Sequence, residues 1–407
     1  MQASVNEREL VLDMLLQITR DGEYSHIVIK NVLDKYQYLD KRERAFITRV
    51  VNGTLERMIE IDYIINQFSK VKVNKMKPVI RTILRSSVYQ MKYMDSVPDS
   101  AICNEAVKLA GKRGFVNLKG FVNGVLRNIG RNLDKISYPD EKDQEAFISI
   151  KYSLPEWMVK QWLKVYDEET VKMIGKAFME EKPLTVRFDE HKIKKAELIS
   201  ILEKEGVTAG EVPEIPCALY LSGYDHLSAL PSFCEGLYQV QDLSSMQVAL
   251  WSEVKAGDQV LDVCAAPGGK AIHIAELLNG TGHVEARDLT DPHKKETADI
   301  VIADLPCSGL GVLGKKPDLR YKMNEKTEAD LVELQKKILS VVKDYVKPGG
   351  KLLYSTCTIH REENEGNVEW FLKEYPEFEL VKEKQMIPGR DAGDGFYIAI
   401  LKRVNHE

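Results

Sequence analysis

The spacing of apolar residues changes along the 407-residue chain, and this change limits what it can fold into. Up to about residue 132 the apolar side chains recur at helical spacing, as in Leu10, Met14 and Ile18. From Gly236 onward, short β-rich apolar runs alternate with helical stretches, which is typical of a parallel sheet with crossovers. Because a chain of this length is also too long for one ordinary core, the sequence predicts several domains.

We predict three domains. An all-helical domain covers residues 1–140, a small α/β subdomain covers 141–235, and a Rossmann-like, doubly wound α/β domain covers 236–407. The middle part carries two strand patterns and a helix pattern, at 183–189, 218–223 and 196–205. In the last part we expect strands within residues 259–265, 283–289, 299–305, 349–356 and 396–404, with a helix at 270–278.

Charge is unevenly distributed along the chain. The whole sequence has a formal net charge of −5, yet residues 1–140 hold 23 Lys and Arg against 16 Asp and Glu. Between Tyr63 and Met94 there are seven basic residues and no acidic one. A second basic group surrounds the segment GFVNLKGFVNGVLRN. Two basic clusters in one domain favour a phosphate-binding surface, although each alone also fits a solvated helix face.

The remaining composition excludes several classes of protein. No apolar run is long enough for a membrane helix, and the charged N-terminus lacks the apolar core of a secretory signal, so we expect a cytoplasmic protein. The six cysteines are scattered without a CxxC pair or a Cys/His cluster. Neither a zinc site nor a disulfide framework is therefore indicated, and no metal is expected.

A glycine turn and a later carboxylate point to an adenosine-containing cofactor. The segment VLDVCAAPGGK reads as a strand, a Pro-Gly-Gly turn and the start of a helix. Such a turn lets the backbone approach a ligand, and the helix N-terminus favours an anionic group. Asp288 follows Lys270 by 18 residues, which suits hydrogen bonds to ribose hydroxyls. The GxGxxG motif that is typical of nicotinamide-dependent enzymes is absent from this turn.

Two thiols and a carboxylate follow two of the predicted strands. In the run DIVIADLPCSG, Asp304 lies at the end of the predicted strand and Cys307 lies three residues later. Cys357 directly follows the predicted strand GGKLLYST. Ligands of open α/β sheets bind outside the carboxyl ends of the strands, so we expect these side chains to face one crevice.

This set of residues fits methylation of cytosine at carbon 5. That carbon becomes nucleophilic only after a thiolate adds to carbon 6, and a base must later remove the carbon 5 proton so that the thiol can leave. Cys357, Asp304 and Cys307 supply a nucleophile, an acid that binds nitrogen 3 and a base.

The motifs LDVCAAPGGK, IADLPCSGLG and YSTCT resemble those of the two-cysteine RNA cytosine-C5 methyltransferases. Together with a helical front part ending in GFVNGVLRN, the chain resembles the Sun (Fmu) family of ribosomal small-subunit RNA methyltransferases, whose front domain is similar to the antiterminator NusB. The resemblance covers nearly the whole chain.

The resemblance implies residue roles. Cys357 would be the nucleophile, Cys307 would assist product release, and Asp304 would lie near both the methyl donor and the base. S-adenosylmethionine would be held by Asp288 at the ribose, by Asp304, and by the glycine-turn residues Cys264, Ala265, Ala266, Pro267, Gly268, Gly269 and Lys270. The implied substrate is a cytosine of small-subunit (16S) ribosomal RNA, and we expect a monomer.

The chain departs from the family after Asp288. Only 11 residues separate Asp288 from Ile300, where the family has a helix, a third strand and another connection. One parallel crossover already needs about 10 to 12 residues, so we predict that the third strand is missing and that the second strand becomes a sheet edge. A family Asp that contacts the cofactor is lost with it, so we expect weakened cofactor binding.

Two other functions remain open from the sequence. The first is a non-catalytic RNA-binding or ribosome-assembly protein that keeps the helical domain beside a damaged cofactor pocket. The second is a Rossmann oxidoreductase, which leaves both cysteines unexplained. RNA is expected as a loop or single strand, because the target base must be splayed out to expose carbon 6.

Overall fold

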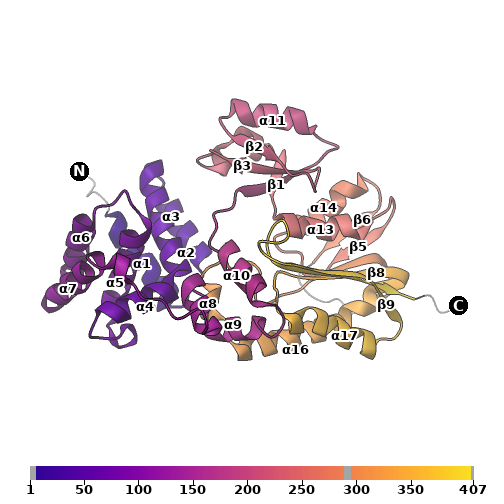
Figure 1. The fold of residues 1–407 in the computed structure, drawn as a ribbon. Coiled ribbons are helices and arrows are strands. Elements are labelled where there is room, and N and C mark those ends of the chain that lie inside the picture. Colours follow the sequence, from indigo (N-terminus) through magenta and orange to yellow (C-terminus); the bar gives the residue numbers. More distant parts are fainter. Residues whose placement is uncertain (1–5, 288–294, 405–407) are drawn as a thin grey trace. The chain divides into compact units, whose positions relative to one another are not determined.

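The computed structural model describes residues 6–287 and 295–404 (Figure 1). The chain divides into two compact units, Met1–Met179 with Leu313–Lys322, and Glu180–Val312 with Met323–Glu407. The domain boundaries expected after residues 140 and 235 stay predictions. Within the described residues, no helix combines the length and the apolarity needed to cross a membrane.

The first unit is all-helical, as predicted for residues 1–140, and it also includes helices between residues 144 and 177. The helices between residues 7 and 130 each bury an apolar face around a common core, to which α1 contributes Val11 and Ile18 and α5 contributes Ile83. Pro78 occupies the first turn of α5, where its missing N–H costs nothing. The helices are α1 Glu7–Thr19, α2 Ser25–Lys35, α3 Lys41–Glu56, α4 Met58–Phe68, α5 Pro78–Tyr93, α6 Asp99–Lys112, α7 Lys119–Gly130, α8 Gln144–Tyr152, α9 Glu156–Trp162 and α10 Glu168–Ala177.

A ten-residue segment far along the chain also belongs to this unit. Leu313–Lys322, which includes α15 Leu319–Lys322, packs with the helices. The buried Asp318 carboxylate accepts hydrogen bonds from the Ser25 backbone N–H at 3.2 Å and from its hydroxyl at 2.5 Å. The Tyr321 hydroxyl donates to the Leu55 carbonyl at 2.6 Å. Nothing in the sequence pattern indicated this attachment.

The second unit begins with a small antiparallel sheet in the order β2-β3-β1-β4, with α11 beside it (Figure 1). The predicted strands and helix of this part are confirmed as β1 Leu184–Phe188, β3 Ala218–Ser222 and α11 Lys195–Lys204. The short strands β2 Thr208–Glu211 and β4 Tyr238–Val240 were not predicted. A short helix, α12 Pro231–Cys234, precedes β4.

The larger sheet is mixed, with strand order β6-β5-β7-β8-β10-β9. Strands β6, β5, β7 and β8 pair in parallel, whereas β10 runs antiparallel to both β8 and β9. The expectation of a parallel sheet is therefore wrong for β10, and β9 was not predicted. The strands are β5 Gln259–Asp262, β6 His283–Ala286, β7 Ala298–Asp304, β8 Val346–Thr356, β9 Phe378–Met386 and β10 Phe396–Arg403.

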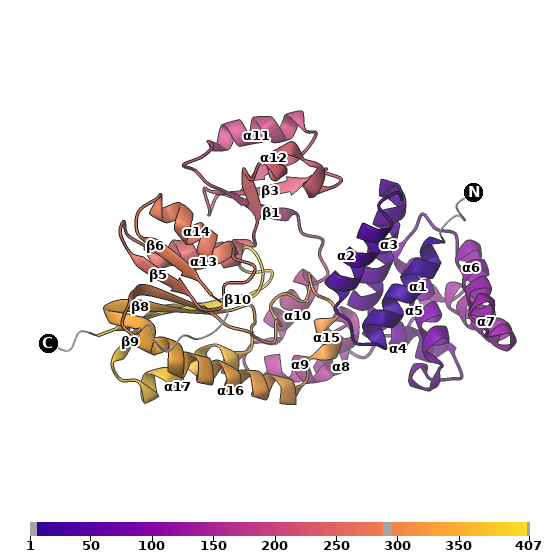
Figure 2. The same cartoon turned by 180° about the vertical axis from the view of Figure 1, so that it is seen from behind.

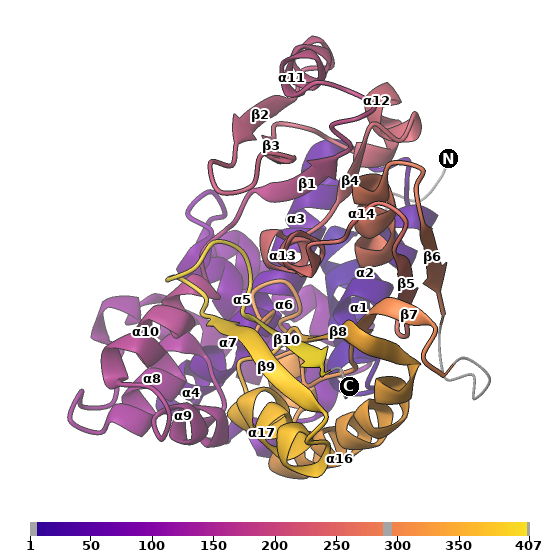
Figure 3. The ribbon, with the colours of Figure 1, turned by 90° about the vertical axis from the view of Figure 1, so that its right-hand side faces the viewer.

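Helices cover both faces of this sheet. Helices α13 Leu243–Ser252 and α14 Gly269–Leu278 lie over one face, and α16 Glu325–Val342 and α17 Glu365–Glu374 over the other (Figures 2 and 3). Neighbouring residues of one strand point into different cores: Val301 packs toward α16 and α17, and Ile302 toward α13 and α14. Both are fully buried, which is why the central strands read as continuous apolar runs.

Among the described residues, β6 is an edge strand that pairs with β5 alone, as predicted. Only 11 residues connect Ala286 to Ala298 at the start of β7, on the far side of β5. An extended chain of that length reaches about 36 Å, enough to pass one strand but not to form a helix and a strand as well. No residue of β6 is fully buried, so this end of the sheet stays open.

Candidate functional site

The two predicted thiols lie together at the carboxyl ends of β7 and β8. The parallel register pairs Asp304 with Ser355, so the loops that leave the two strands start side by side. Cys307 and Cys357 follow in these loops, and their Sγ atoms are 3.3 Å apart, with either one able to donate. Both side chains are partly exposed. The expectation that two distant cysteines share one site agrees with this geometry.

Asp304 is held between a cation and a hydroxyl. Its carboxylate accepts from the Lys270 ammonium at 2.6 Å and from the Ser355 hydroxyl at 2.8 Å. Burial lowers the pKa of Lys270, but Asp304 and then Cys357 offset this effect, so that its pKa is raised above the usual value. Lys270 therefore carries a positive charge beside the carboxylate and the thiols. Its assignment to the cofactor stays a prediction.

The pKa of Cys307 is raised well above that of an ordinary thiol. The hydrogen bond to Cys357 contributes most, followed by burial and by the negative charges of Cys357 and Glu363. The Cys307 thiol therefore holds its proton more tightly than an ordinary thiol does.

The glycine turn forms a shallow pocket at the end of β5. Gly268 adopts φ +98°, a conformation that favours glycine, and α14 begins at the next residue. The pocket has a volume of about 310 Å³ and is lined by Ala265, Ala266, Pro267, Gly268, Ala286 and Arg287. Cys264, Gly269 and Lys270 flank these residues in sequence. Asp288, predicted to bind the ribose, lies outside the described residues.

A buried polar cluster lies directly behind the thiols. The Glu363 carboxylate, which is 0% exposed, accepts from the Ser308 backbone N–H at 2.9 Å and from the Ser308 hydroxyl at 2.5 Å. The Gln335 amide donates to it at 2.9 Å. The Ser308 and Thr358 hydroxyls are hydrogen bonded to each other at 2.8 Å. The residue after each thiol is thus joined to the residue after the other.

His360 bridges two carboxylates in this cluster. Its Nδ1 lies 3.3 Å from Glu363 and 3.9 Å from Glu328, and all three side chains are buried. These are residue types that bind metals, and their ligand atoms lie within 4.8 Å of one another. Because the Glu363 oxygens already receive several donors, the cluster is described best as a hydrogen-bond network.

The small sheet is tied to the helix that starts at the glycine turn. Arg187 of β1 is buried, donates to Gln241 at 2.7 Å and forms an ion pair with Glu276 of α14. Burial lowers the pKa of Arg187 to about 10. Burial, together with the Arg187 charge, lowers the pKa of His273 to about 3, so this histidine is neutral. No chemistry was predicted for this part, and its contacts show that it supports α14.

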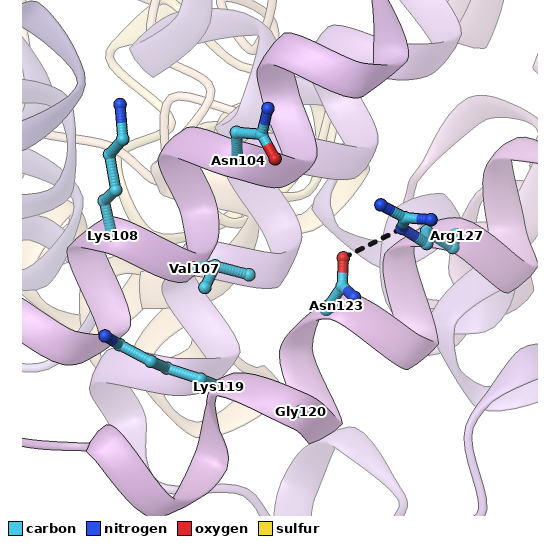
Figure 4. A pocket seen from close by; sticks show the side chains of 7 residues that line it. All are labelled: Asn104, Val107, Lys108, Lys119, Gly120, Asn123 and Arg127. Atoms are coloured by element: carbon cyan, nitrogen blue, oxygen red, sulfur yellow. Dashed lines mark hydrogen bonds between the residues drawn. The ribbon is translucent and has the colours of Figure 1, made fainter.

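A basic hollow lies on the surface of the helical unit, between α6 and α7. Figure 4 shows Lys108 and Lys119 beside it, with Arg127 hydrogen bonded to Asn123 at 3.1 Å. The hollow has a volume of about 480 Å³ and is lined by Asn104, Val107, Lys108, Lys119, Gly120, Asn123 and Arg127. Two of its basic residues, Lys119 and Arg127, belong to the second basic group seen in the sequence.

Sequence reasoning missed the residues that support the thiols. Ser308 and Thr358 directly follow them, but a hydroxyl after a cysteine has no signal of its own. Glu363 lies in the polar run REENEG, which reads as a solvated turn. Only the folding of this run against β8 and α16 shows that its carboxylate is buried.

Three family models match successive parts of the chain. The NusB family matches residues 5–131, the ferredoxin-like domain of RsmF/B-like methyltransferases matches residues 154–225, and the 16S rRNA methyltransferase RsmB/F family matches residues 249–297 and 286–402. The last match breaks in two at residues 286–297, where the connection after β6 is short.

Relatives match this chain over nearly its whole length. The chain is 33% identical to the probable ribosomal RNA small subunit methyltransferase B of Bacillus subtilis, over 97% of this chain and 98% of the relative. It is 31% identical to the protein of the same name from Synechocystis, over 98% and 100%. The crystal structure of PH0851 matches with a TM-score of 0.81 at 24% identity, over 99% of this chain and 100% of the other, which supports the fold.

The raised pKa of His360 predicts a pH-dependent stability. Burial lowers this pKa, and the hydrogen bond to Glu363 with the charges of Glu328, Glu363 and Glu362 raises it above 6.5 overall. The stabilisation is therefore complete below pH 6.5 and is lost as the pH rises through the folded-state value. Urea unfolding between pH 6 and 9 should show a steeper fall for the wild type than for His360→Gln. An equal fall of stability with pH in the two proteins would contradict this prediction.

Proposed function

Since the chain belongs to the family of ribosomal RNA small subunit methyltransferase B, we propose that it methylates carbon 5 of a cytosine in 16S ribosomal RNA through a covalent adduct with Cys357. The observation that carries this proposal is the pair of thiols 3.3 Å apart, beside the Asp304 carboxylate. A methyltransferase that alkylates a nucleophilic nitrogen or oxygen needs no thiol. Carbon 5 of cytosine does, because it must first be activated.

In the first step the Cys357 thiolate adds to carbon 6 of the cytosine. A C–S bond forms, and the electrons of the 5,6 double bond become available at carbon 5, as in an enamine. Asp304 is placed to bind nitrogen 3 with a proton passed to it by its partner Lys270, because the ring gains negative charge and an ionised carboxylate has no proton to donate. Lys270, paired with Asp304 at 2.6 Å, holds this carboxylate in position. S-adenosylmethionine, when bound, supplies the methyl group for carbon 5.

Cys307 serves the release step. While Cys357 is an anion, Cys307 keeps its proton, because the hydrogen bond to Cys357 is the largest cause of its raised pKa. Once Cys357 is bonded to carbon 6, that cause is gone and Cys307 can lose its proton to water. The Cys307 thiolate then takes the proton from carbon 5, the double bond re-forms, and the C–S bond to Cys357 breaks.

The glycine turn fits a cofactor with an anionic amino-acid end. The N-terminus of α14 at Gly269 offers backbone N–H groups and a positive potential to a carboxylate. A Cβ placed on Gly268 would approach only the side-chain end of Ile272, at 3.7 Å, so the space in front of the turn is open. We assign Cys264 to Lys270 to this cradle and Asp288, from its position in the sequence, to the ribose.

The helical unit supplies the RNA-binding surface in this proposal. Lys108, Lys119 and Arg127 gather around one hollow, where asparagine side chains add neutral hydrogen-bonding groups. Such a mixture suits phosphate and sugar contacts rather than recognition of base edges. The small-subunit RNA itself is proposed from the family, whose relatives carry that substrate in their names.

Replacing each of the two cysteines is expected to stop the reaction at a different step. Cys357→Ala should abolish transfer of labelled methyl from S-adenosylmethionine to unmodified small-subunit RNA, because no adduct forms. Cys307→Ala should instead accumulate a protein–RNA adduct that survives denaturing electrophoresis, because release is blocked. Cys234→Ala is the control, since this cysteine is exposed and lies in the small α/β part. An adduct formed by Cys357→Ala would refute the assignment of the nucleophile.

The short connection after β6 predicts weak cofactor binding. One wall of the pocket ends at Ala286 and Arg287, and the family match breaks at this point. Calorimetric titration with S-adenosylmethionine should give a dissociation constant weaker than micromolar, whereas micromolar or tighter binding would contradict it. If no cofactor binds and the RNA still does, the second candidate, a non-catalytic RNA-binding or assembly protein, is favoured.

The basic hollow predicts a change in salt dependence. Replacing Lys108, Lys119 and Arg127 by Gln should reduce the slope of log affinity against log salt by about 2, because each phosphate contact to a single strand contributes about 0.7. Filter binding or anisotropy at several salt concentrations measures this slope. The control replaces the exposed Lys30, Lys35 and Lys41 of α2 and α3 by Gln, an equal loss of charge. A like reduction in the control would mean that net charge alone attracts the RNA.

A further inference from the structure

The two reactive loops are joined by the residues that follow the thiols. Ser308 follows Cys307 and Thr358 follows Cys357, and the two hydroxyls are 2.8 Å apart. Both side chains are 0% exposed. The Gly311 N–H donates to the Cys357 carbonyl at 3.1 Å, a second link between the same loops. The spacing of the thiols is therefore fixed from behind by buried polar contacts.

Glu363 is at the centre of these contacts. Its carboxylate receives the Ser308 N–H and hydroxyl, the Gln335 amide at 2.9 Å and the His360 ring at 3.3 Å. A carboxylate accepts at both oxygens and has no proton to give away, so it matches a surrounding of donors. An amide in the same place would direct its NH₂ group against some of these donors.

We propose that Glu363 is a positioning residue for the two-thiol chemistry: its carboxylate, through Ser308 and Thr358, fixes the separation of Cys307 and Cys357. The proposal rests on the function assigned to the two thiols above. In this proposal Glu363 acts on the thiol positions through the residue that follows each thiol.

The charge of Glu363 has a second effect on the pair. The hydrogen bond to Cys357, burial and the Cys357 charge raise the pKa of Cys307, and the Glu363 charge raises it further. Glu363 thereby helps to keep the proton on Cys307 and leaves Cys357 as the nucleophile. Position and charge thus support the same division of roles.

A purely architectural role would act through different atoms. The Tyr354 hydroxyl and the Asn367 amide, which hold the start of α17, bond to the backbone carbonyl of Glu363 and not to its side chain. Glu363→Gln leaves these bonds in place. This substitution disturbs instead the side-chain hydrogen bonds that lead to Ser308.

The separation of Cys307 and Cys357 is tested without RNA or cofactor, so that the result does not depend on the proposed methylation. Diamide, an azo compound, oxidises two thiols: both S–H bonds break, one S–S bond forms, and the azo group takes up the two hydrogens as a hydrazine. The Cys307–Cys357 disulfide is followed by mass spectrometry of the linked peptides. At a pH above the alkylation midpoints of both proteins, where their thiolate contents are equal, it should form about tenfold more slowly in Glu363→Gln than in the wild type, because small displacements strongly reduce the rate of reaction between held groups.

The matched control is Glu362→Gln, the neighbouring carboxylate, whose side chain is 64% exposed. It should form the disulfide at the wild-type rate. A rate in Glu363→Gln equal to that of this control overturns the proposal. If Glu363→Gln does not fold, as judged by circular dichroism, Ser308→Ala replaces it in the same comparison with the same expected slowing.

A pH profile separates positioning from general loosening. Alkylation of Cys307 by iodoacetamide, read by mass spectrometry at each pH, should have its midpoint at lower pH in Glu363→Gln than in the wild type, since a charge that raises the Cys307 pKa is gone. Loosening alone would speed the reaction at every pH without moving the midpoint. An unmoved midpoint overturns the electrostatic part of the proposal. Loss of methyl transfer in Cys357→Ala is judged separately, so the two proposals fail independently.

Discussion

The parallel pairing of β7 with β8 is the constraint on which the rest of the site depends. Their register places Asp304 opposite Ser355, so the loops carrying Cys307 and Cys357 leave the same edge of the sheet from adjacent positions. Fifty residues of chain separate the thiols, yet their sulfur atoms lie 3.3 Å apart. Because parallel strands need a crossover, α16 follows from the same constraint, and it brings Gln335 to the buried side of the loops.

Polar contacts rather than apolar packing define the region behind the thiols. Burying Glu363 costs free energy unless every acceptor is satisfied, and the donors around it meet that requirement. Such a network tolerates little displacement of its members, since a small shift leaves a buried charge without its hydrogen-bond partners. The apolar core sets the sheet, and this network sets the finer placement of the loops. The chain then leaves the second unit after Val312, contributes Leu313–Lys322 to the helical unit, and returns at Met323.

At the opposite edge of the sheet, strand β6 is less completely buried than the central strands. Strand β6 has one neighbour among the described residues and no fully buried residue, and the connection that follows it is too short for the helix and strand of the family. The thiols follow β7 and β8, which pair with each other, and β5 lies between β7 and the edge strand β6. Their geometry therefore does not depend on it, whereas the pocket lined by Ala286 and Arg287 does. The proposed chemistry of the thiols and the proposed binding of the methyl donor therefore rest on different parts of the sheet.

The sequence by itself determined the helical front part, the strands β5 to β8 and β10, the glycine turn and the identity of the two cysteines, because each has a local signal in periodicity or motif. It also determined the open edge at β6, since chain length limits what a connection can contain. It missed β9, which is largely exposed and reads as a polar run, and it made β10 parallel although β10 is antiparallel to β8. Strand direction, the Lys270–Asp304 pair and the burial of Glu363 were decided only by the tertiary structure, because each depends on residues that are distant in the chain and leave no pattern along it.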